Sequence, residues 1–292
     1  MPFALLYPFL SVVPAGVLML VLKARYWWME SVRLRAPVSD KLLRTPGESA
    51  HRKKEELDDQ IIDSMVWIFG FPPILLISYL ASTRTTSPPP SMVWVFVVLL
   101  GVSVYVKYVI KLVGLLERRS DSRLGASGER AVGEELNRLM TEGCHVFHDF
   151  PLDQKGNIDH VVVAPTGVYA VETKTRRKGE PAGRQKAHEV IYDGKGLQFP
   201  GWYDKEHVIQ TRNEARSLSD FLGRGVGFAV PVKPVLTFPG WHVTSRASGD
   251  VLVLNPKMIR SAVIEEGSPT LTPDEIKRIA LRLEEKCRDV EF

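Results

Sequence analysis

Three long apolar runs in the first 120 residues limit the folds that this chain can adopt. The runs cover residues 3–22, 61–82 and 92–116, and about 20 apolar residues are enough for a helix to cross a bilayer. The third run becomes amphipathic after Val106, where Lys107 and Lys111 can extend towards the lipid headgroups. We therefore predict a membrane region of three transmembrane helices over residues 1–120.

Other structures are compatible with these runs. The first has the length of a cleaved signal peptide, and the other two also suit buried helices of a soluble domain. No basic residue precedes the first run, and no small-x-small cleavage pattern follows it. Instead it is followed by Lys23, Arg25 and two tryptophans, a combination typical of a membrane interface. This favours a transmembrane helix over a signal peptide for residues 3–22.

The basic residues around the runs predict the orientation in the membrane. Nine Lys and Arg residues lie in the segment 23–60, whereas the connection between the second and third runs contains only Arg84. Because cytoplasmic loops carry the excess of Lys and Arg, the N-terminus is expected outside and residues 121–292 in the cytoplasm, at the plasma (inner) membrane. The net charge of +4 has the same origin and says little about nucleic acid.

Residues 121–292 have the alternating pattern of a mixed α/β domain. The two cysteines, Cys144 and Cys287, form no disulfide framework or zinc pattern, which fits a reduced compartment. Proline follows a capping residue at Asn255 and at Thr272, which predicts two closing helices in a C-terminal extension over 255–290. The other expected elements are helices over 125–140 and 207–222 and strands over 144–150, 157–164, 168–174, 189–192, 196–199, 227–238 and 251–254.

The strands over 157–164 and 168–174 are predicted to form a β-hairpin, because a short Pro/Gly turn separates two runs rich in Val and Ile. Alternate residues of a strand share a face, so Glu172 and Lys174 project from the same side. A turn centred near Thr166 places Asp159 opposite Glu172 and Thr173. The hairpin therefore brings two carboxylates and an ammonium close together.

This set of side chains suits phosphodiester cleavage. Mg²⁺ prefers oxygen ligands and keeps several of its waters, so Asp159, Glu172 and the backbone carbonyl of Thr173 can hold it. A divalent cation can activate water and stabilise the leaving oxygen. Lys174 would lie near the scissile phosphate and position the attacking water. The alternative is that a Glu-x-Lys pair simply lies on the solvated face of a strand.

The order of motifs resembles the nuclease-related domain family. The matching segments are Gly125-x-x-Gly128-Glu129, 157–163, 167–174 and Gln210. This family belongs to the restriction-endonuclease-like superfamily, which is defined by an Asp…Glu-x-Lys core. The resemblance implies an α/β fold, with an α+β mixed sheet flanked by helices and the site at one edge of the hairpin. It also implies that Glu129 is a further metal ligand and that Gln210 orients Lys174 or the phosphate.

Further residues are candidates for contacts with nucleic acid. Trp202 and Tyr203 have side chains able to stack a base, although surface packing is an alternative. His160 should point away from Asp159 into the core. His145 and His148, three apart on a strand, should face opposite sides. Phosphate contacts are expected from Arg176, Arg177, Lys178, Arg184 and Lys186, which also read as a solvated charge run.

The expected protein is a membrane-anchored, metal-dependent nuclease that uses Mg²⁺ or Mn²⁺, with DNA favoured over RNA as its substrate. The alternative is a membrane-tethered module that binds nucleic acid or protein without catalysis, because a fold does not determine a function. Carboxylate-dependent metal binding distinguishes the two. The sequence does not predict an oligomeric state.

Overall fold

The computed structural model describes residues 24, 25, 28, 41–84, 91–152, 156–178, 186–266 and 268–290. The predicted helix over 3–22 and the predicted contact residue Arg184 lie outside these residues and stay predictions. The chain forms two compact units. Residues 54–121 belong to the first, and residues 40–53 and 122–291 to the second.

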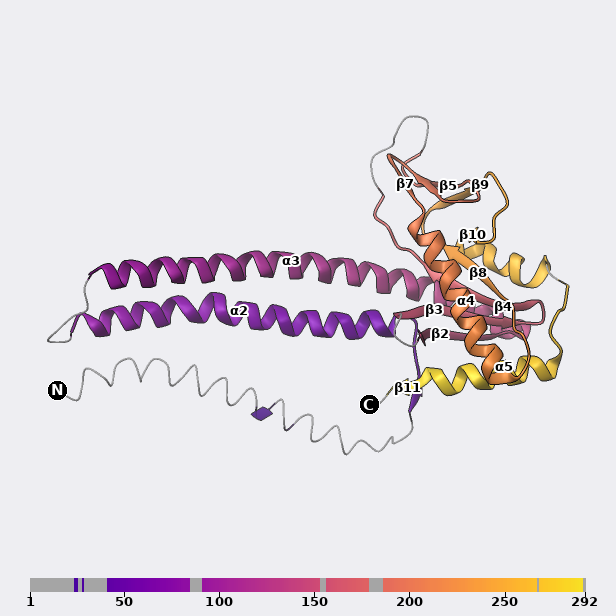
Figure 1. Ribbon diagram of the computed structural model, residues 1–292, viewed down its shortest axis with the longest axis horizontal. Helices are drawn as coiled ribbons and strands as arrows, with labels where there is room; N and C mark the ends of the chain where they lie inside the picture. Colours follow the sequence, from indigo (N-terminus) through magenta and orange to yellow (C-terminus); the bar gives the residue numbers. More distant parts are fainter. Residues whose placement is uncertain are drawn as a thin grey trace. The chain divides into compact units, whose positions relative to one another are not determined.

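Two long helices, α2 (Glu48–Ser82) and α3 (Ser91–Asn137), supply the first unit (Figure 1). Each contains a stretch that is long and apolar enough to cross a membrane, and only 17% and 6% of these stretches are buried. Two of the three predicted membrane helices are therefore present among the described residues. By their length and composition, these helices are weak support for membrane association.

The two helices pack against each other within the first unit. Leu57 and Ile61 of α2 form a buried cluster with Leu115 of α3. Further along, the rings of Trp67 and Tyr108 stack with their centroids 5.4 Å apart. An apolar seam therefore joins the helices, and many of their other apolar side chains are exposed.

The helices differ from the predicted bounds. α2 begins at Glu48 instead of near residue 61, because the segment 48–60 is rich in strong helix formers and contains the i,i+4 ion pair Lys54–Asp58. The helices predicted over 92–116 and 125–140 are one continuous helix, α3. Its internal glycines cost about 1 kcal/mol each, which the surrounding helix formers and packing offset.

A five-stranded mixed sheet forms the centre of the second unit. The strands β2 (His145–Leu152), β3 (Gly156–Ala164) and β4 (Gly167–Thr173) form an antiparallel meander. On the other side of β4, β8 (Val232–Thr237) and β10 (Leu252–Leu254) continue the sheet in parallel, in the order β10-β8-β4-β3-β2. The β3–β4 pair is the predicted hairpin, with Ala164 opposite Gly167.

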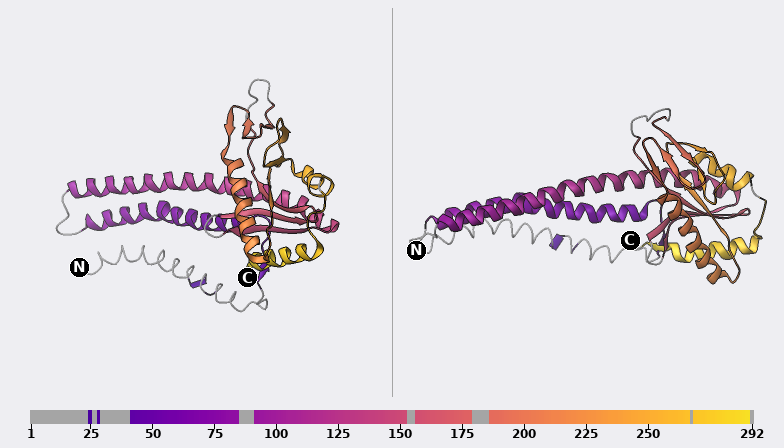
Figure 2. Two further views of the ribbon diagram at one scale, coloured as in Figure 1. Left: turned by 45° about the vertical axis from the view of Figure 1, so that its right-hand side comes forward. Right: turned by 45° about the horizontal axis from the view of Figure 1, so that its top comes forward.

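Helices cover both faces of this sheet (Figures 1 and 2). Alternate residues of β3 and β4 point to opposite faces, and both sets are apolar, so both faces are buried. On one face, Val161 and Ala170 contact α4 (Glu206–Val226) and α5 (Pro273–Cys287). On the other face, Val162 and Val171 contact the end of α3 and the turn η3 (Ser261–Glu265).

A second, smaller sheet stands at the end of this unit opposite to α5 (Figure 2). Its strand order is β7-β6-β5-β9, where β7 is an edge strand. Phe199 and Trp241 pack edge to face in the core between this sheet and β8. The strands are β5 (Glu189–Tyr192), β6 (Leu197–Phe199), β7 (Trp202–Asp204) and β9 (His242–Ser245).

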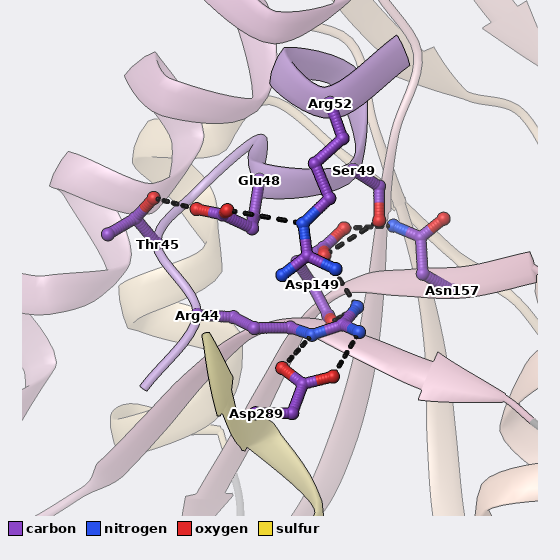
Figure 3. Close-up of polar contacts among 8 residues, drawn as sticks. All are labelled: Arg44, Thr45, Glu48, Ser49, Arg52, Asp149, Asn157 and Asp289. Carbon is purple, nitrogen blue, oxygen red and sulfur yellow. Dashed lines mark hydrogen bonds and ion pairs between the residues drawn. The ribbon is translucent and has the colours of Figure 1, made fainter. Parts of the chain in front are cut away.

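Residues 41–53 precede α3 in the chain but fold into the second unit. β1 (Leu42–Leu43) pairs antiparallel with β11 (Arg288–Val290). Arg44 donates two hydrogen bonds to Asp289, of 2.7 and 2.5 Å, and one of 2.8 Å to Asp149 (Figure 3). Ser49 and Asn157 also donate to the Asp149 carboxylate, at 2.7 and 2.6 Å. We call residues 41–53 the juxtamembrane strap.

Other differences from the predicted elements lie around α4 and near the C-terminus. Gly227 ends α4 in a left-handed conformation (φ 82°), so the strand predicted over 227–238 begins only at Val232. The helix predicted over 255–264 is a short 3₁₀ turn, η2 (Pro256–Met258), followed by the π-type turn η3. The last helix has the predicted Thr272 capping box. β7 and β9 were not predicted, because three or four residues carry too little pattern.

Candidate active site

The hairpin brings Asp159 to the end of β4. His160 pairs with Val171, which places Asp159 level with Glu172 on the neighbouring strand. The Asp159 carboxylate accepts a hydrogen bond of 2.7 Å from the backbone N–H of Thr173. Both carboxylates are buried, with exposed fractions of 7% for Asp159 and 4% for Glu172. The predicted Asp and Glu positions are therefore neighbours in the structure.

Lys174 and Gln210 converge on Glu172. The Lys174 ammonium lies 2.6 Å from Glu172 Oε1. The Gln210 side chain, on the first turns of α4, donates a hydrogen bond of 3.0 Å to the same oxygen. The backbone N–H of Lys174 is bonded to the Thr237 carbonyl of β8, which orients the chain beyond β4. Glu172 is thus the centre of this arrangement.

Glu129 reaches the site from α3, and a glycine makes this approach possible. The helix passes so close to Thr175 that a Cβ at Gly128 would overlap Thr175 Oγ1 and lie 2.9 Å from Thr175 Cβ. Only glycine fits this contact without displacing α3 or the segment that contains Thr175. Glu129 follows directly, is partly buried, and interacts electrostatically with Glu172 and Lys174.

The structure adds Glu214, a site residue that the sequence analysis missed. Its exposed fraction is 8%, and its Oε1 accepts a hydrogen bond of 2.7 Å from the same Gln210 amide that contacts Glu172. Glu214 follows Gln210 by four residues, so both lie on one face of α4. The signal available in the sequence was a charged residue at a position of α4 that faces the core. It becomes distinctive only once Glu172 is known to lie opposite.

Four carboxyl groups therefore face one lysine. Burial, together with the charges of Glu172 and Glu129, raises the pKa of Asp159 well above its ordinary value. Burial also raises the pKa of Glu129 to about 7 and that of Glu214 to about 8, with repulsion by nearby carboxylates adding to both shifts. Burial lowers the pKa of Lys174, but its ion pair with Glu172 outweighs this effect and the net pKa is raised. The raised pKa values reduce the negative charge that four carboxyl groups would otherwise carry beside Lys174.

Residues 124–239 match the family model described as the nuclease-related domain, NERD. By this match, residues 124–239 are similar to nuclease-related domains. The resemblance seen in the sequence is thereby confirmed, and all six site residues lie within the match. Comparisons with curated proteins and with solved structures give no match. The match ends before η2, η3 and α5, and it does not include the juxtamembrane strap.

The donor set of the nuclease-related domain fits a hard divalent cation. Glu172 Oε2 and Glu214 Oε2 are buried and have no hydrogen-bond partner among the described residues. Leaving such oxygens unpaired is costly, and a cation that prefers oxygen ligands would satisfy them. Within the same residues, no three His, Cys, Asp or Glu side chains are already arranged as a metal site. The fit therefore rests on the chemistry of the oxygens.

The histidines of the nuclease-related domain lie in different environments. His160 is fully buried, and its Nδ1 lies 2.9 Å from Nδ1 of His148 on β2. His148 Nε2 lies 2.9 Å from the Asn137 side chain of α3. Burial lowers the pKa of His148 to about 4, so the pair is uncharged at neutral pH. His160 thus lies in the core, and His145 is exposed and separate from this pair.

The basic residues predicted to contact phosphate are exposed where the structure describes them. Arg176, Arg177 and Lys178 begin two residues after Lys174, and Lys186 lies after an undescribed segment. Trp202 and Tyr203 are each 41% exposed. Tyr203 donates its hydroxyl hydrogen to Asp193 (2.8 Å), whereas Trp202 packs on Phe199 and beneath Arg176. The two aromatic residues therefore differ in their surroundings.

Proposed function

We propose that this protein is a membrane-anchored, metal-dependent nuclease that hydrolyses phosphodiester bonds of nucleic acid. The observation that carries the proposal is the group of four buried or partly buried carboxyls around Lys174, with two carboxylate oxygens that have no hydrogen-bond partner among the described residues. Perturbed carboxyl groups gathered at one place are typical of active sites. The nuclease-related domain supports nucleic acid as the substrate and a divalent cation, Mg²⁺ or Mn²⁺, as the cofactor.

The site residues have distinct proposed roles. Asp159 and Glu172 hold the cation, with the Thr173 carbonyl and Glu129 as further ligands. When bound, the cation supplies charge to the phosphoryl oxygens and lowers the pKa of a water. Lys174, fixed by its ion pair with Glu172, positions the attacking water and stabilises charge on the phosphate. Gln210 holds Glu172 in place through its 3.0 Å hydrogen bond.

The membrane anchor in this proposal consists of α2, α3 and the predicted helix over 3–22. With the N-terminus outside, residues 121–292 lie in the cytoplasm at the plasma (inner) membrane. A reporter fused after Phe292 tests the orientation. We expect fluorescence from a reporter that folds only in the cytoplasm, and activity of an exported phosphatase at the same position contradicts the topology.

Nucleic acid is the proposed partner, with DNA favoured over RNA. Arg176, Arg177 and Lys178 supply exposed positive charge close to Lys174 in the chain. Lys186 is also exposed, and Arg184 adds to the charge in the sequence. Contacts of this kind neutralise phosphates without reading the base sequence. Binding should therefore weaken steeply as the salt concentration rises.

Metal binding and cleavage are measured together on the purified full chain in detergent. Mg²⁺ and Mn²⁺ are titrated by calorimetry, and the same samples are incubated with plasmid, single-stranded DNA and RNA. Asp159→Asn should lose both metal binding and cleavage, because one buried ligand charge disappears. The matched control is Glu134→Gln, which removes an exposed carboxylate from α3 and should retain both.

The outcome separates the nuclease from the non-catalytic module. If Asp159→Asn loses cleavage and metal binding while Glu134→Gln keeps both, the result supports the nuclease. If the wild type binds nucleic acid but neither binds metal at millimolar concentrations nor cleaves any substrate, the nuclease proposal is wrong. The protein is then a tethered binding module built on a nuclease-like fold.

A further inference from the structure

Three planar groups form a layered stack beside the candidate active site. The rings of Phe199 and Trp202 lie 4.2 Å apart at an interplanar angle of 2°. The guanidinium of Arg176 lies over the Trp202 ring, 5.3 Å from its centroid. Because Phe199 covers one face of the indole, the guanidinium covers the other. Phe199 is buried and Arg176 is exposed, so the stack runs from the core to the surface.

Arg176 is held in this position from two further sides. Its guanidinium donates a hydrogen bond of 3.0 Å to His207 Nε2, whose other ring nitrogen lies against Asp204. Its backbone carbonyl accepts a hydrogen bond of 3.2 Å from the indole N–H of Trp241. Among the described residues, no carboxylate forms an ion pair with Arg176. The guanidinium is thus fixed in orientation, with donors left for a ligand.

The stack adjoins the candidate catalytic lysine. Arg176 follows Lys174 by two residues, and its partner His207 lies at the start of α4. Burial lowers the pKa of His207. The Asp204 carboxylate raises this pKa, the positive charges of Lys174 and Arg176 lower it, and the net pKa is lowered. Arg176 contacts this imidazole directly and Lys174 is close enough to act on it, so the stack lies beside Lys174.

We propose that the exposed face of the Arg176 guanidinium stacks an unpaired base, while its free N–H groups contact a neighbouring phosphate of single-stranded nucleic acid. Guanidinium planes stack bases as aromatic rings do, and Trp202 and Phe199 support this plane from below. A base inside a duplex already stacks on its neighbours and cannot occupy this position. The inference rests on the proposed nuclease function and identifies its substrate as single-stranded.

Binding is measured by fluorescence anisotropy with the full chain in detergent, carrying Glu172→Gln to prevent cleavage. The probes are a short labelled single strand and the duplex of the same sequence. Arg176→Lys keeps the charge but removes the plane, and Trp202→Leu removes its support. Each should weaken single-strand binding about 5- to 150-fold, the range for one stacked base. Trp202→Phe should retain most of the affinity, and Arg177→Lys is the matched control on the adjacent exposed arginine.

Unchanged single-strand binding by Arg176→Lys overturns the inference, because charge alone then explains the contact. Equal binding of duplex and single strand also overturns it. If Trp202→Leu fails to fold, a second experiment uses strands that each lack one base and measures their binding to the Glu172→Gln protein. Weaker binding when one particular base is missing supports the stack, and equal binding of all these strands refutes it. If the wild type cleaves nothing while these variants lose single-strand binding, the nuclease proposal fails and the stack stands.

Discussion

Replacing Arg44 by methionine should destabilise the second unit strongly, although Arg44 lies outside the matched nuclease-related domain. Its guanidinium is the cation that compensates Asp149, a carboxylate with no exposed surface. Methionine keeps the apolar stem but leaves Asp149 buried without its cation. Among the described residues, hydrogen bonds from Ser49 and Asn157 would remain on that carboxylate.

The magnitude follows from the burial of the two partners. Removing one member of a buried ion pair costs about 3–5 kcal/mol, because the other charge stays buried. The second pair, to Asp289, is 36% exposed on the carboxylate side and contributes at most about 1 kcal/mol. Burial already raises the pKa of Asp149, so protonation can relieve part of the cost. We expect a loss of about 3 kcal/mol, or about 6–12 °C in Tm for a unit of this size.

The full chain in detergent is suited to urea titration with pulse proteolysis, which reports unfolding of the second unit. Arg52→Ala is the matched control, since Arg52 belongs to the same strap but forms only an exposed i,i+4 pair with Glu48. That change should cost about 0.3–0.5 kcal/mol. Asp149→Asn combined with Arg44→Met should recover much of the lost stability, because the unpaired charge is then absent.

Two results would refute this reasoning. The first is a cost for Arg44→Met no larger than for Arg52→Ala. The second is no recovery in the double variant, which would show that the loss comes from packing or from strand β1. The expected result instead makes the juxtamembrane strap a structural part of the second unit, so that a soluble fragment beginning after α2 would lack a needed segment.

Two further predictions concern the site. Gly128→Ala should destabilise the protein by about 1–3 kcal/mol, because the added Cβ overlaps Thr175. The control Gly125→Ala should be neutral or stabilising by up to about 1 kcal/mol, because the nearest described atom to its Cβ is Glu129 Oε1 at 3.9 Å. Equal denaturation midpoints for the two variants would contradict the close approach at Gly128. The metal-free protein should lose stability as pH rises from about 5 to 8. Glu129 and Glu214 have folded pKa values of about 7 and 8, above their ordinary 4.5, so the native state holds protons that the unfolded state has released. Tm measured in chelator should fall over this window and fall less in Glu214→Gln, and a flat profile would show that these carboxyls are not buried as described.

Local pattern was enough to predict the hairpin. Two β-rich runs and a short turn determine which residues face each other, so Asp159, Glu172 and Lys174 are placed by nearest-neighbour geometry alone. The family resemblance added Glu129 and Gln210, which lie on helices far away in the sequence. The structure brings both to Glu172, Gln210 by a direct hydrogen bond and Glu129 through the close approach at Gly128.

The sequence by itself determined the apolar helices, the β3–β4 hairpin and the nuclease-related motifs, because each depends on residues close together in the chain or in a known order. Only the tertiary structure decided the surroundings of Glu214 and Arg44 and brought Phe199, Trp202 and Arg176 together. Glu214 gains its raised pKa from burial against Glu172, and Arg44 gains its importance from Asp149, 105 residues away. Such effects arise from desolvation and from charges at short distance, and neither is visible until the chain has folded.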